Sequence, residues 1–426
     1  MVLKFMTQSQ DLTGVDARHL AALVDITRAI TSSLEFDHVL NTVIDSIMQV
    51  MRAQRGFLMI ADETSGELRI RVARGVDGTD LASDESYSRT VVRQAVQMRQ
   101  TRLTNNAQYD FQFGQSIIMR GLRAILCAPM LVQDRLIGVV YVDTALRSGL
   151  FTESDQKLMD AVAGQAGVAI ENARLYRVAV EKGRLERELQ MAREIQESLL
   201  PRQIPDCTGY EIAARWRSAR EVAGDFYDIF TLPGGSVGLV IADVSDKGAP
   251  AALMMAAARS IIRSHALSDR DLLSVLQLTN RQMALDAENG MFVTAFYSVL
   301  HPDGESEHVC AGHPPPILYR ASDNQFIMLP RGGLALGWFA ENPLRVTRLT
   351  LHPGDTLVYF TDGLSEAEND QGHFFDMERL THALQARIHL SAEEIADGII
   401  AEVDQFCGSA RLADDLTLCV IRRTQE

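Results

Sequence analysis

The sequence predicts an α+β protein with two domains joined by a helical connector. Near the N-terminal end, two amphipathic helices precede antiparallel strands and a closing helix, an order typical of α+β domains. Heptad-spaced apolar residues follow, and the rest of the chain alternates strand hairpins with two helix pairs. We divide the chain into a tail at 1–15, a first domain at 16–175, a connector at 176–205 and a second domain at 206–426.

Composition limits the class of protein. A chain of 426 residues with 46% hydrophobic and 23% charged residues is ordinary for a soluble protein of two or three domains. The net charge of −15 argues against nucleic acid or an anionic membrane as a partner. The apolar runs are too short to cross a membrane, and the start lacks the apolar core of a secretory signal. Because the five cysteines are scattered, we expect a reducing, cytoplasmic location.

The first domain is predicted from its periodicities. Apolar residues recur at helical spacing in the first two segments, and β-favouring runs flank turn residues in the later ones. The expected helices are 16–33, 37–53, 88–98 and 152–175, and the expected strands are 56–61, 67–73, 124–132 and 135–142. Thr152-Glu-Ser-Asp155 is a capping signal for the last helix.

Residues 16–175 resemble a GAF domain. The likeness is carried by Ala128-Pro-Met-Leu, by Ile137-Gly-Val-Val-Tyr-Val-Asp143 and by Phe151-Thr with Asp155. The resemblance implies a sensor for an unknown small-molecule or protein signal, or a dimerisation module, and the motifs name no ligand. Cys127 and His38 could attach a cofactor, but a core cysteine and a surface histidine are the favoured interpretation.

The connector carries two interleaved heptad series. One is Val178, Leu185, Ala192 and Leu199, and the other is Leu175, Lys182, Leu189 and Gln196. This seam predicts a parallel coiled coil, hence a homodimer, with Lys182 and Gln196 as polar seam residues. The alternative is a single amphipathic helix that lies on its own domain. Pro201 and Pro205 end the helix and mark the boundary.

The second domain is predicted to be a β-sandwich flanked by helices. The expected strands are 226–232, 237–242, 291–300, 307–313, 317–319, 326–329, 344–351, 356–360 and 416–421. The expected helices are 251–265, one ending near 287, 377–386 and 392–406.

In the second domain, the expected strands 226–232 and 237–242 form a hairpin, and an aspartate flanks each strand at its open end. Asp225 and Asp243 each lie nine positions from Gly234, in the turn Pro233-Gly-Gly235. If the strands pair symmetrically about this turn, the two carboxylates end level with each other. Like charges at that distance require a cation between them or a proton on one of them. The hairpin therefore predicts a metal site.

Two more aspartates follow the same logic. Asp362 leaves a buried strand, and Asp414 stands at the entrance of the last strand. If that strand runs antiparallel to the strands before Asp243 and Asp362, all four carboxylates meet at one rim. Oxygen ligands select hard cations such as Mg²⁺ or Mn²⁺, and two such ions indicate phosphoester hydrolysis.

Seven ordered motifs over residues 190–423 resemble the SpoIIE-type bacterial phosphatases, within the metal-dependent PPM (protein phosphatase 2C-like) family of serine/threonine phosphatases. They are Ala192-Arg-Glu-Ile-Gln-Glu-Ser-Leu-Leu-Pro201, Ala223-Gly-Asp-Phe-Tyr-Asp228, Ala242-Asp-Val-Ser-Asp-Lys-Gly248, Met291-Phe-Val-Thr-Ala-Phe296, Ala311-Gly-His-Pro-Pro-Pro316, Tyr359-Phe-Thr-Asp-Gly363 and Asp414-Asp-Leu-Thr417. The resemblance implies an α-β-β-α sandwich and two Mn²⁺ or Mg²⁺ ions. By position, these ions would be held by Asp225, Asp243, the Val244 carbonyl, Asp362 and Asp414. It also implies a phosphorylated anti-sigma-factor antagonist as substrate and partner.

Two residues depart from the family pattern. Ala223 and Asp246 stand where glycine is usual, and Asp246 adds negative charge three residues after Asp243. Neither change removes an expected ligand. The alternative function is a catalytically weak, phosphatase-like scaffold that docks a signalling partner. A cyclase would leave six of the motifs unexplained, and the marks of a histidine kinase are not visible in the sequence.

Overall fold

The structure is a computed structural model, and it describes residues 17–75, 78–81, 87–105, 124–144, 151–268, 270–286 and 290–424. The tail expected at 1–15 lies outside these residues. The chain forms two compact units, Met1–Arg184 and Leu185–Glu426, whose boundary falls inside the predicted connector. No helix among the described residues is both long enough and apolar enough to span a membrane.

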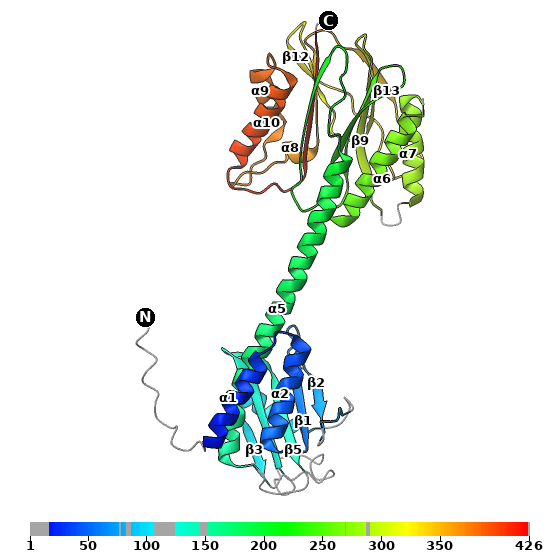
Figure 1. Cartoon of the computed structure of the whole chain (residues 1–426). Helices are drawn as coiled ribbons and strands as arrows, with labels where there is room; N and C mark the ends of the chain where they lie inside the picture. The colour runs from blue at the N-terminus through cyan, green and yellow to red at the C-terminus, as the bar shows by residue number, and fades with distance from the viewer. Residues whose placement is uncertain are drawn as a thin grey trace. The chain divides into compact units, whose positions relative to one another are not determined.

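The first unit is a five-stranded antiparallel sheet with helices on both faces (Figure 1). The sheet order is β2-β1-β5-β4-β3. Helices α1, α2 and the first part of α5 bury one apolar cluster against it, and α3 buries a second on the opposite face. The elements are α1 (Ala17–Thr31), α2 (Phe36–Met51), β1 (Arg55–Ala61), β2 (Leu68–Arg74), α3 (Arg89–Met98), β3 (Arg102–Asn105), β4 (Ala124–Val132) and β5 (Arg135–Thr144). Cys127 is buried in the sheet and His38 is exposed, as the favoured interpretation expects.

The closing helix and the connector form one helix, α5 (Glu153–Leu199), of 47 residues. The capping signal is confirmed: Thr152 Oγ1 accepts from the Asp155 amide at 3.2 Å, and Asp155 accepts from the Thr152 amide at 2.7 Å. Three seam residues, Leu175, Val178 and Leu185, are 52–56% exposed. The prediction for Gln196 is wrong, because its side chain is buried against residues 223 and 252 of the second unit. Heptad spacing places a residue on a helix face, but it does not say what that face contacts.

The second unit is an α-β-β-α sandwich (Figure 1). One sheet has the order β13-β10-β9-β8-β7, and α6 and α7 pack on its outer face. The other has the order β12-β11-β14-β15-β6, and α9 and α10 cover it. A third apolar cluster, which includes Phe296 and Tyr359, fills the space between the sheets. The elements are β6 (Tyr210–Arg217), β7 (Phe226–Thr231), β8 (Val237–Val244), α6 (Ala249–Ala266), α7 (Leu272–Asp286), β9 (Val293–Leu300), β10 (Glu305–Ala311), β11 (Ile317–Arg320), β12 (Gln325–Met328), β13 (Val346–Thr350), β14 (Thr356–Phe360), α8 (Asp362–Ser365), α9 (Asp376–Arg387), α10 (Ala392–Cys407) and β15 (Leu416–Arg423).

The strand β6 is absent from the sequence prediction. Its polar residues Glu211, Arg215 and Arg217 interrupt the apolar pattern, because β6 lies at the edge of its sheet and is only half-buried. It pairs with β15 along its whole length, from Tyr210 opposite Arg423 to Arg217 opposite Leu416. The short elements β3 and α8 are also absent from the prediction.

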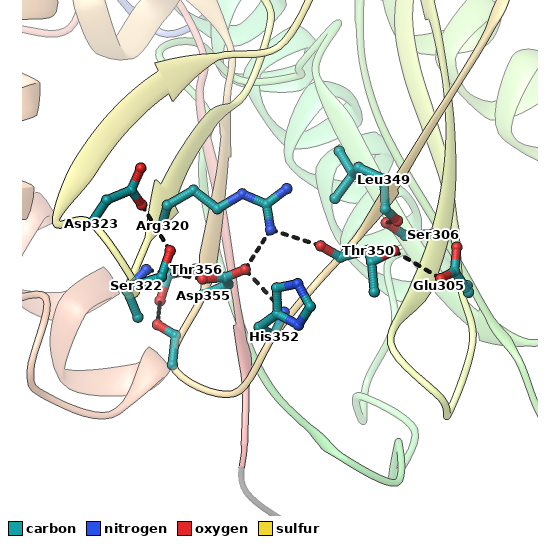
Figure 2. A network of polar contacts seen from close by, with 12 residues as sticks. Glu305, Ser306, Arg320, Ser322, Asp323, Leu349, Thr350, His352, Asp355 and Thr356 are labelled. Carbon is teal, nitrogen blue, oxygen red and sulfur yellow. Dashed lines mark hydrogen bonds and ion pairs between the residues drawn. The ribbon is translucent and has the colours of Figure 1, made fainter.

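A polar network fixes the start of β14 (Figure 2). Asp355, 1% exposed, accepts hydrogen bonds from Arg320 at 2.6 Å and from the amides of Ala321 and His352 at 2.9 Å. Arg320 also donates to the Thr350 carbonyl at 2.7 Å. Since Arg320 ends β11 and Thr350 ends β13, the network ties the two sheets together at this end of β14. Asp362 follows the opposite end of the same strand.

Candidate metal centre

The β7–β8 hairpin brings Asp225 and Asp243 level, as predicted. Phe226 pairs with Ala242, and the next pair in this register is Asp225 with Asp243. The turn is closed by the Leu232 amide, which donates to the Ser236 carbonyl at 2.7 Å. Gly234 and Gly235 both have φ of +87°, a conformation that glycine adopts without steric cost. The charge of Asp243 contributes to a raised pKa of Asp225, as expected for two carboxyl groups that lie close together.

Asp225 is the most deeply buried of the four candidate aspartates, at 2% exposure. Its Oδ2 accepts hydrogen bonds from the hydroxyl groups of Thr361 at 2.6 Å and Thr417 at 2.7 Å. Burial, and secondly the charge of Asp243, raise the pKa of Asp225 well above its usual value. The two threonines oppose this shift but do not cancel it.

Asp243 and Asp362 continue the acidic cluster. Burial, followed by the charge of Asp362, raises the pKa of Asp243 to about 7. Burial and then Asp414 raise the pKa of Asp362, which is the first residue of α8. Gly363 after it has no room for a side chain, because a Cβ would lie 1.9 Å from the Asp415 carbonyl oxygen. The Asp-Gly pair therefore lets the end of β14 approach the entrance of β15.

Asp414 and Asp415 have different surroundings, as their alternation on the chain predicts. Asp415 accepts hydrogen bonds from the backbone amides of Ala219 and Gly224, both at 2.8 Å. Asp414 is half-exposed and forms an ion pair with Lys247 at 2.9 Å. Lys247 Nζ also donates to the Ala413 carbonyl at 2.9 Å. Asp415 thus fixes the backbone at Ala219 and Gly224, whereas Asp414 faces the ammonium group of Lys247.

The Val244 carbonyl lies beside Gly224, the residue before Asp225. A Cβ on Gly224 would come within 3.1 Å of the Val244 oxygen, so glycine permits this close approach. Gly224 thus brings the segment that precedes Asp225 against the Val244 carbonyl. The strand β8 lies in one sheet, and β14 and β15 lie in the other. The rim is built across the two sheets.

The residues present fit a hard divalent cation. Burial raises the pKa values of Asp225, Asp243 and Asp362, and a neighbouring carboxylate raises each further (Asp243, Asp362 and Asp414, respectively). A cation would relieve this repulsion. The donors are all oxygen atoms, which Mg²⁺ and Mn²⁺ prefer. Among the described residues, however, no group of three or more His, Cys, Asp or Glu side chains is arranged so that it could hold a metal ion.

Other candidate residues have structural surroundings. Asp228 is fully buried and paired with Arg263 at 2.8 Å and Arg259 at 3.1 Å, both on α6. It is therefore neither on the solvent face nor among the cluster of acids. His313 is 2% exposed, and its Nδ1 lies 2.8 Å from Thr294 Oγ1. Burial lowers the pKa of His313 to about 3, so it is neutral at neutral pH and is a poor proton donor.

Asp246 occupies its turn with a left-handed backbone. Its φ is +90°, a region that glycine adopts freely but that residues with a side chain adopt at a cost. This explains why the family pattern has glycine at this position. Its Oδ1 accepts a hydrogen bond from the Lys247 amide at 2.8 Å. The side chain is exposed, and the turn places Lys247 against Asp414.

Four residues that support Asp225 and its segment are not predicted from the sequence. They are Thr361, Thr417, Trp216 and Gln196; the indole Nε1 of Trp216 donates to the Asp225 carbonyl at 3.0 Å. Thr361 and Thr417 do lie inside recognised motifs, one before Asp362 and one three residues after Asp414. Their position next to Asp362 and Asp414 in these motifs is the sequence feature that indicates a role at the site.

The comparisons with known proteins agree with this architecture. Residues 233–424 match the family model described as stage II sporulation protein E (SpoIIE), and residues 33–171 match a GAF domain model. The chain is 30% identical to phosphoserine phosphatase RsbU of Bacillus subtilis over 240 residues, which are 55% of this chain and 70% of RsbU. It is also 30% identical to protein IcfG of Synechocystis over 264 residues, and the match spans only 41% of IcfG. The SiaA-PP2C domain of Pseudomonas aeruginosa has the same fold, with a TM-score of 0.52 and 23% identity over 57% of this chain and 99% of that domain.

Fold and site together define a GAF domain followed by a protein phosphatase 2C-like domain. Phosphatases of this class depend on metal ions. The chain belongs to the SpoIIE-type phosphatase family that includes RsbU.

Proposed function

We propose that the chain is a metal-dependent protein serine/threonine phosphatase regulated through its GAF domain. The single observation that carries this proposal is the rim where Asp225, Asp243, Asp362 and Asp414 meet. Its substrate is phosphoserine or phosphothreonine on a regulatory protein of the anti-sigma-factor-antagonist kind. The description of RsbU as a phosphoserine phosphatase supports that substrate class.

We assign two Mn²⁺ or Mg²⁺ ions to the rim. Asp225, Asp243, the Val244 carbonyl, Asp362 and Asp414 would hold them. Bound ions of this kind act as Lewis acids and lower the pKa of an attacking water. During hydrolysis, a bond forms between the water oxygen and phosphorus while the bond from phosphorus to the seryl oxygen breaks, and that oxygen gains a proton. Thr361 and Thr417 fix the Asp225 carboxylate, and Lys247 forms an ion pair with Asp414, so an ion held by Asp414 would compete with this pair.

The test is phosphate release from a phosphoserine-bearing antagonist protein by the full chain. We expect hydrolysis with added Mn²⁺ and loss of hydrolysis in excess chelator. Undiminished hydrolysis in chelator would overturn the proposal. The scaffold alternative is separated by measuring bound manganese, because a scaffold would bind the phosphoprotein yet retain no manganese after gel filtration.

An exposed aromatic shelf beside the acids supports a protein substrate. The shelf consists of Phe292, Trp338 and Phe339: the first two rings stack at 4.6 Å, and Trp338 and Phe339 are 56% and 54% exposed. The Phe292 amide donates to Ser245 Oγ at 2.8 Å, and the Ser245 amide donates to the Phe292 carbonyl at 2.9 Å, two residues after Asp243.

The backbone around the shelf is fixed by hydrogen bonds from the buried side chain of Asn280. Asn280, 1% exposed, accepts from the Gly337 amide at 3.0 Å and donates to the Phe339 and Ala340 carbonyls at 2.9 and 3.1 Å. A chain with a net charge of −15 repels a phosphoprotein at long range, so uncharged aromatic contacts are a suitable source of affinity. Rigid, half-exposed aromatic residues are typical anchors of protein interfaces.

The double variant Trp338→Ala, Phe339→Ala should separate protein substrates from small ones. We expect kcat/KM for the phosphoprotein to fall by roughly 10- to 100-fold, as for loss of an interface hot spot. Hydrolysis of p-nitrophenyl phosphate should stay within about 2-fold, because neither residue contacts the acids. An equal loss on both substrates would contradict a docking role.

A parallel dimer through α5 is part of the proposal. Leu175, Val178 and Leu185 lie on the predicted seam and are more than half exposed, so a second copy of the helix could cover them. Sedimentation should give a dimer for the full chain and a monomer for Leu185→Glu. A monomeric wild-type chain would remove this part of the proposal.

A further inference from the structure

The three residues 223–225 are held by side chains from three different elements. They precede β7, which begins at Phe226, so the strand ladder does not supply the partners of their backbone groups. Gln196 of α5 contacts Ala223, Asp415 contacts Gly224, and Trp216 of β6 contacts the Asp225 carbonyl. Buried backbone groups need such partners, and here side chains provide them.

The contact from Gln196 is a paired one. Its Nε2 donates to the Ala223 carbonyl at 2.9 Å, and its Oε1 accepts from the Ala223 amide at 3.0 Å. Nε2 also lies 3.5 Å from the Ala252 carbonyl on α6. Gln196 is 4% exposed and Ala223 is fully buried, so water cannot replace these bonds. The side-chain amide of glutamine supplies a donor and an acceptor at once.

A shift of Ala223 would reach the candidate ligands directly. Asp225 is two residues along the chain, and Gly224 lies against the Val244 carbonyl. Thr361 and Thr417 fix the Asp225 carboxylate, and Trp216 fixes the Asp225 carbonyl. Both the side chain and the backbone of Asp225 are therefore held in place. Ligand geometry of a metal site is commonly set by partners of this kind.

We propose that Gln196 is a positioning residue for the metal centre: its amide fixes Ala223 and thereby places Asp225 and the Val244 carbonyl. Gln196 touches neither substrate nor metal. The inference rests on the proposed function, since it supposes that an ion binds at Asp225.

The test is titration of Mn²⁺ into the metal-free full chain, followed by calorimetry. For Gln196→Met, which keeps length and burial but removes both hydrogen bonds, we expect the Kd for Mn²⁺ to rise by roughly 10- to 100-fold. Trp216→Phe, which removes the bond to the Asp225 carbonyl, should raise the Kd in the same direction. This second variant keeps the inference testable if Gln196→Met does not fold.

The matched control is Ile262→Val. Ile262 is fully buried on α6 in the apolar cluster that also contains Leu200, the residue after α5, and it does not hydrogen-bond residues 223–225 through its side chain. We expect its melting temperature to fall while its Kd stays within about 2-fold of wild type. Equal Kd values for Gln196→Met and wild type, or equal increases in Gln196→Met and Ile262→Val, would overturn the positioning role. A wild-type chain that binds no Mn²⁺ would instead overturn the metal centre itself.

Discussion

Replacing Asp243 with asparagine should abolish hydrolysis and, in the metal-free protein, raise the melting temperature. Activity should fall by more than roughly 100-fold, the upper range for residues that only support a ligand. Stability should rise because asparagine removes one charge from a cluster in which Asp225, Asp243 and Asp362 repel one another. A repulsion on the order of 2 kcal/mol corresponds to roughly 4–8 °C for a unit of this size.

The pH dependence of that stabilisation has a definite sign. The pKa of Asp243 is raised from 3.8 to about 7 in the folded protein. Between these values the folded state binds more protons than the unfolded state, so the ionised carboxyl costs more stability as pH rises. The gain from Asp243→Asn should therefore be near zero at about pH 4 and largest above pH 7. Comparing variant with wild type at each pH cancels the titration of groups that lie far from Asp243.

Thermal melts in chelator from pH 4 to 8 measure this effect. The matched control is Asp246→Asn, which removes the same charge from an exposed residue of the following turn. Its melting temperature should change little, within about 0.5 kcal/mol in free energy. A loss of stability in Asp243→Asn at pH 8 would contradict the account of a repulsive, metal-free cluster. Adding Mn²⁺ should stabilise the wild type and not Asp243→Asn.

Removal of Asp228 should be the most destabilising of the proposed substitutions. Asp228→Ala leaves Arg259, whose side chain is 11% exposed, without its buried counter-charge. Breaking a buried ion pair from one side costs roughly 3–5 kcal/mol, or a fall of roughly 6–20 °C in the melting temperature. Arg263 adds to the effect, since it also bonds Asp228 and lies over the Phe230 ring.

Thermal or urea unfolding of the full chain measures this loss. Glu307→Ala serves as the control, because it breaks a pair with Arg348, whose side chain is 73% exposed. That change should cost less than about 1 kcal/mol. Equal effects of the two substitutions would show that α6 does not depend on its ion pairs with β7.

The sequence predicted the level pair of Asp225 and Asp243 because an antiparallel hairpin with a short turn has a fixed register. It also predicted the meeting of Asp362 with Asp414, since β14 and β15 pair antiparallel, with Phe360 opposite Leu418. Both predictions depend only on the antiparallel pairing of two neighbouring strands. The placement of β8 and β14 in different sheets is a property of the sandwich, and strand patterns contain no information about which sheet a strand joins.

Gln196 shows why the supporting residues were harder to predict. Its heptad position indicated a seam, yet its partner is the backbone of a residue 27 positions away. Trp216 was missed for a related reason: it lies on β6, whose arginines hide the strand pattern. Side chains that support a site act through tertiary contacts, and their types alone do not distinguish them from surface polar residues.

The side chains that hold residues 223–225 are spread along almost the whole second unit. Gln196 and Trp216 precede Asp225, whereas Thr417 follows it by 192 residues. Closing a loop of that length costs about 5 kcal/mol of chain entropy, which the packing of the two sheets must supply. A chain released from the ribosome before residue 414 lacks the Asp414 carboxylate and the Thr417 hydroxyl together. The acidic rim is thus complete only after residues 414–417 have been synthesised, and shorter nascent chains do not carry the full ligand set.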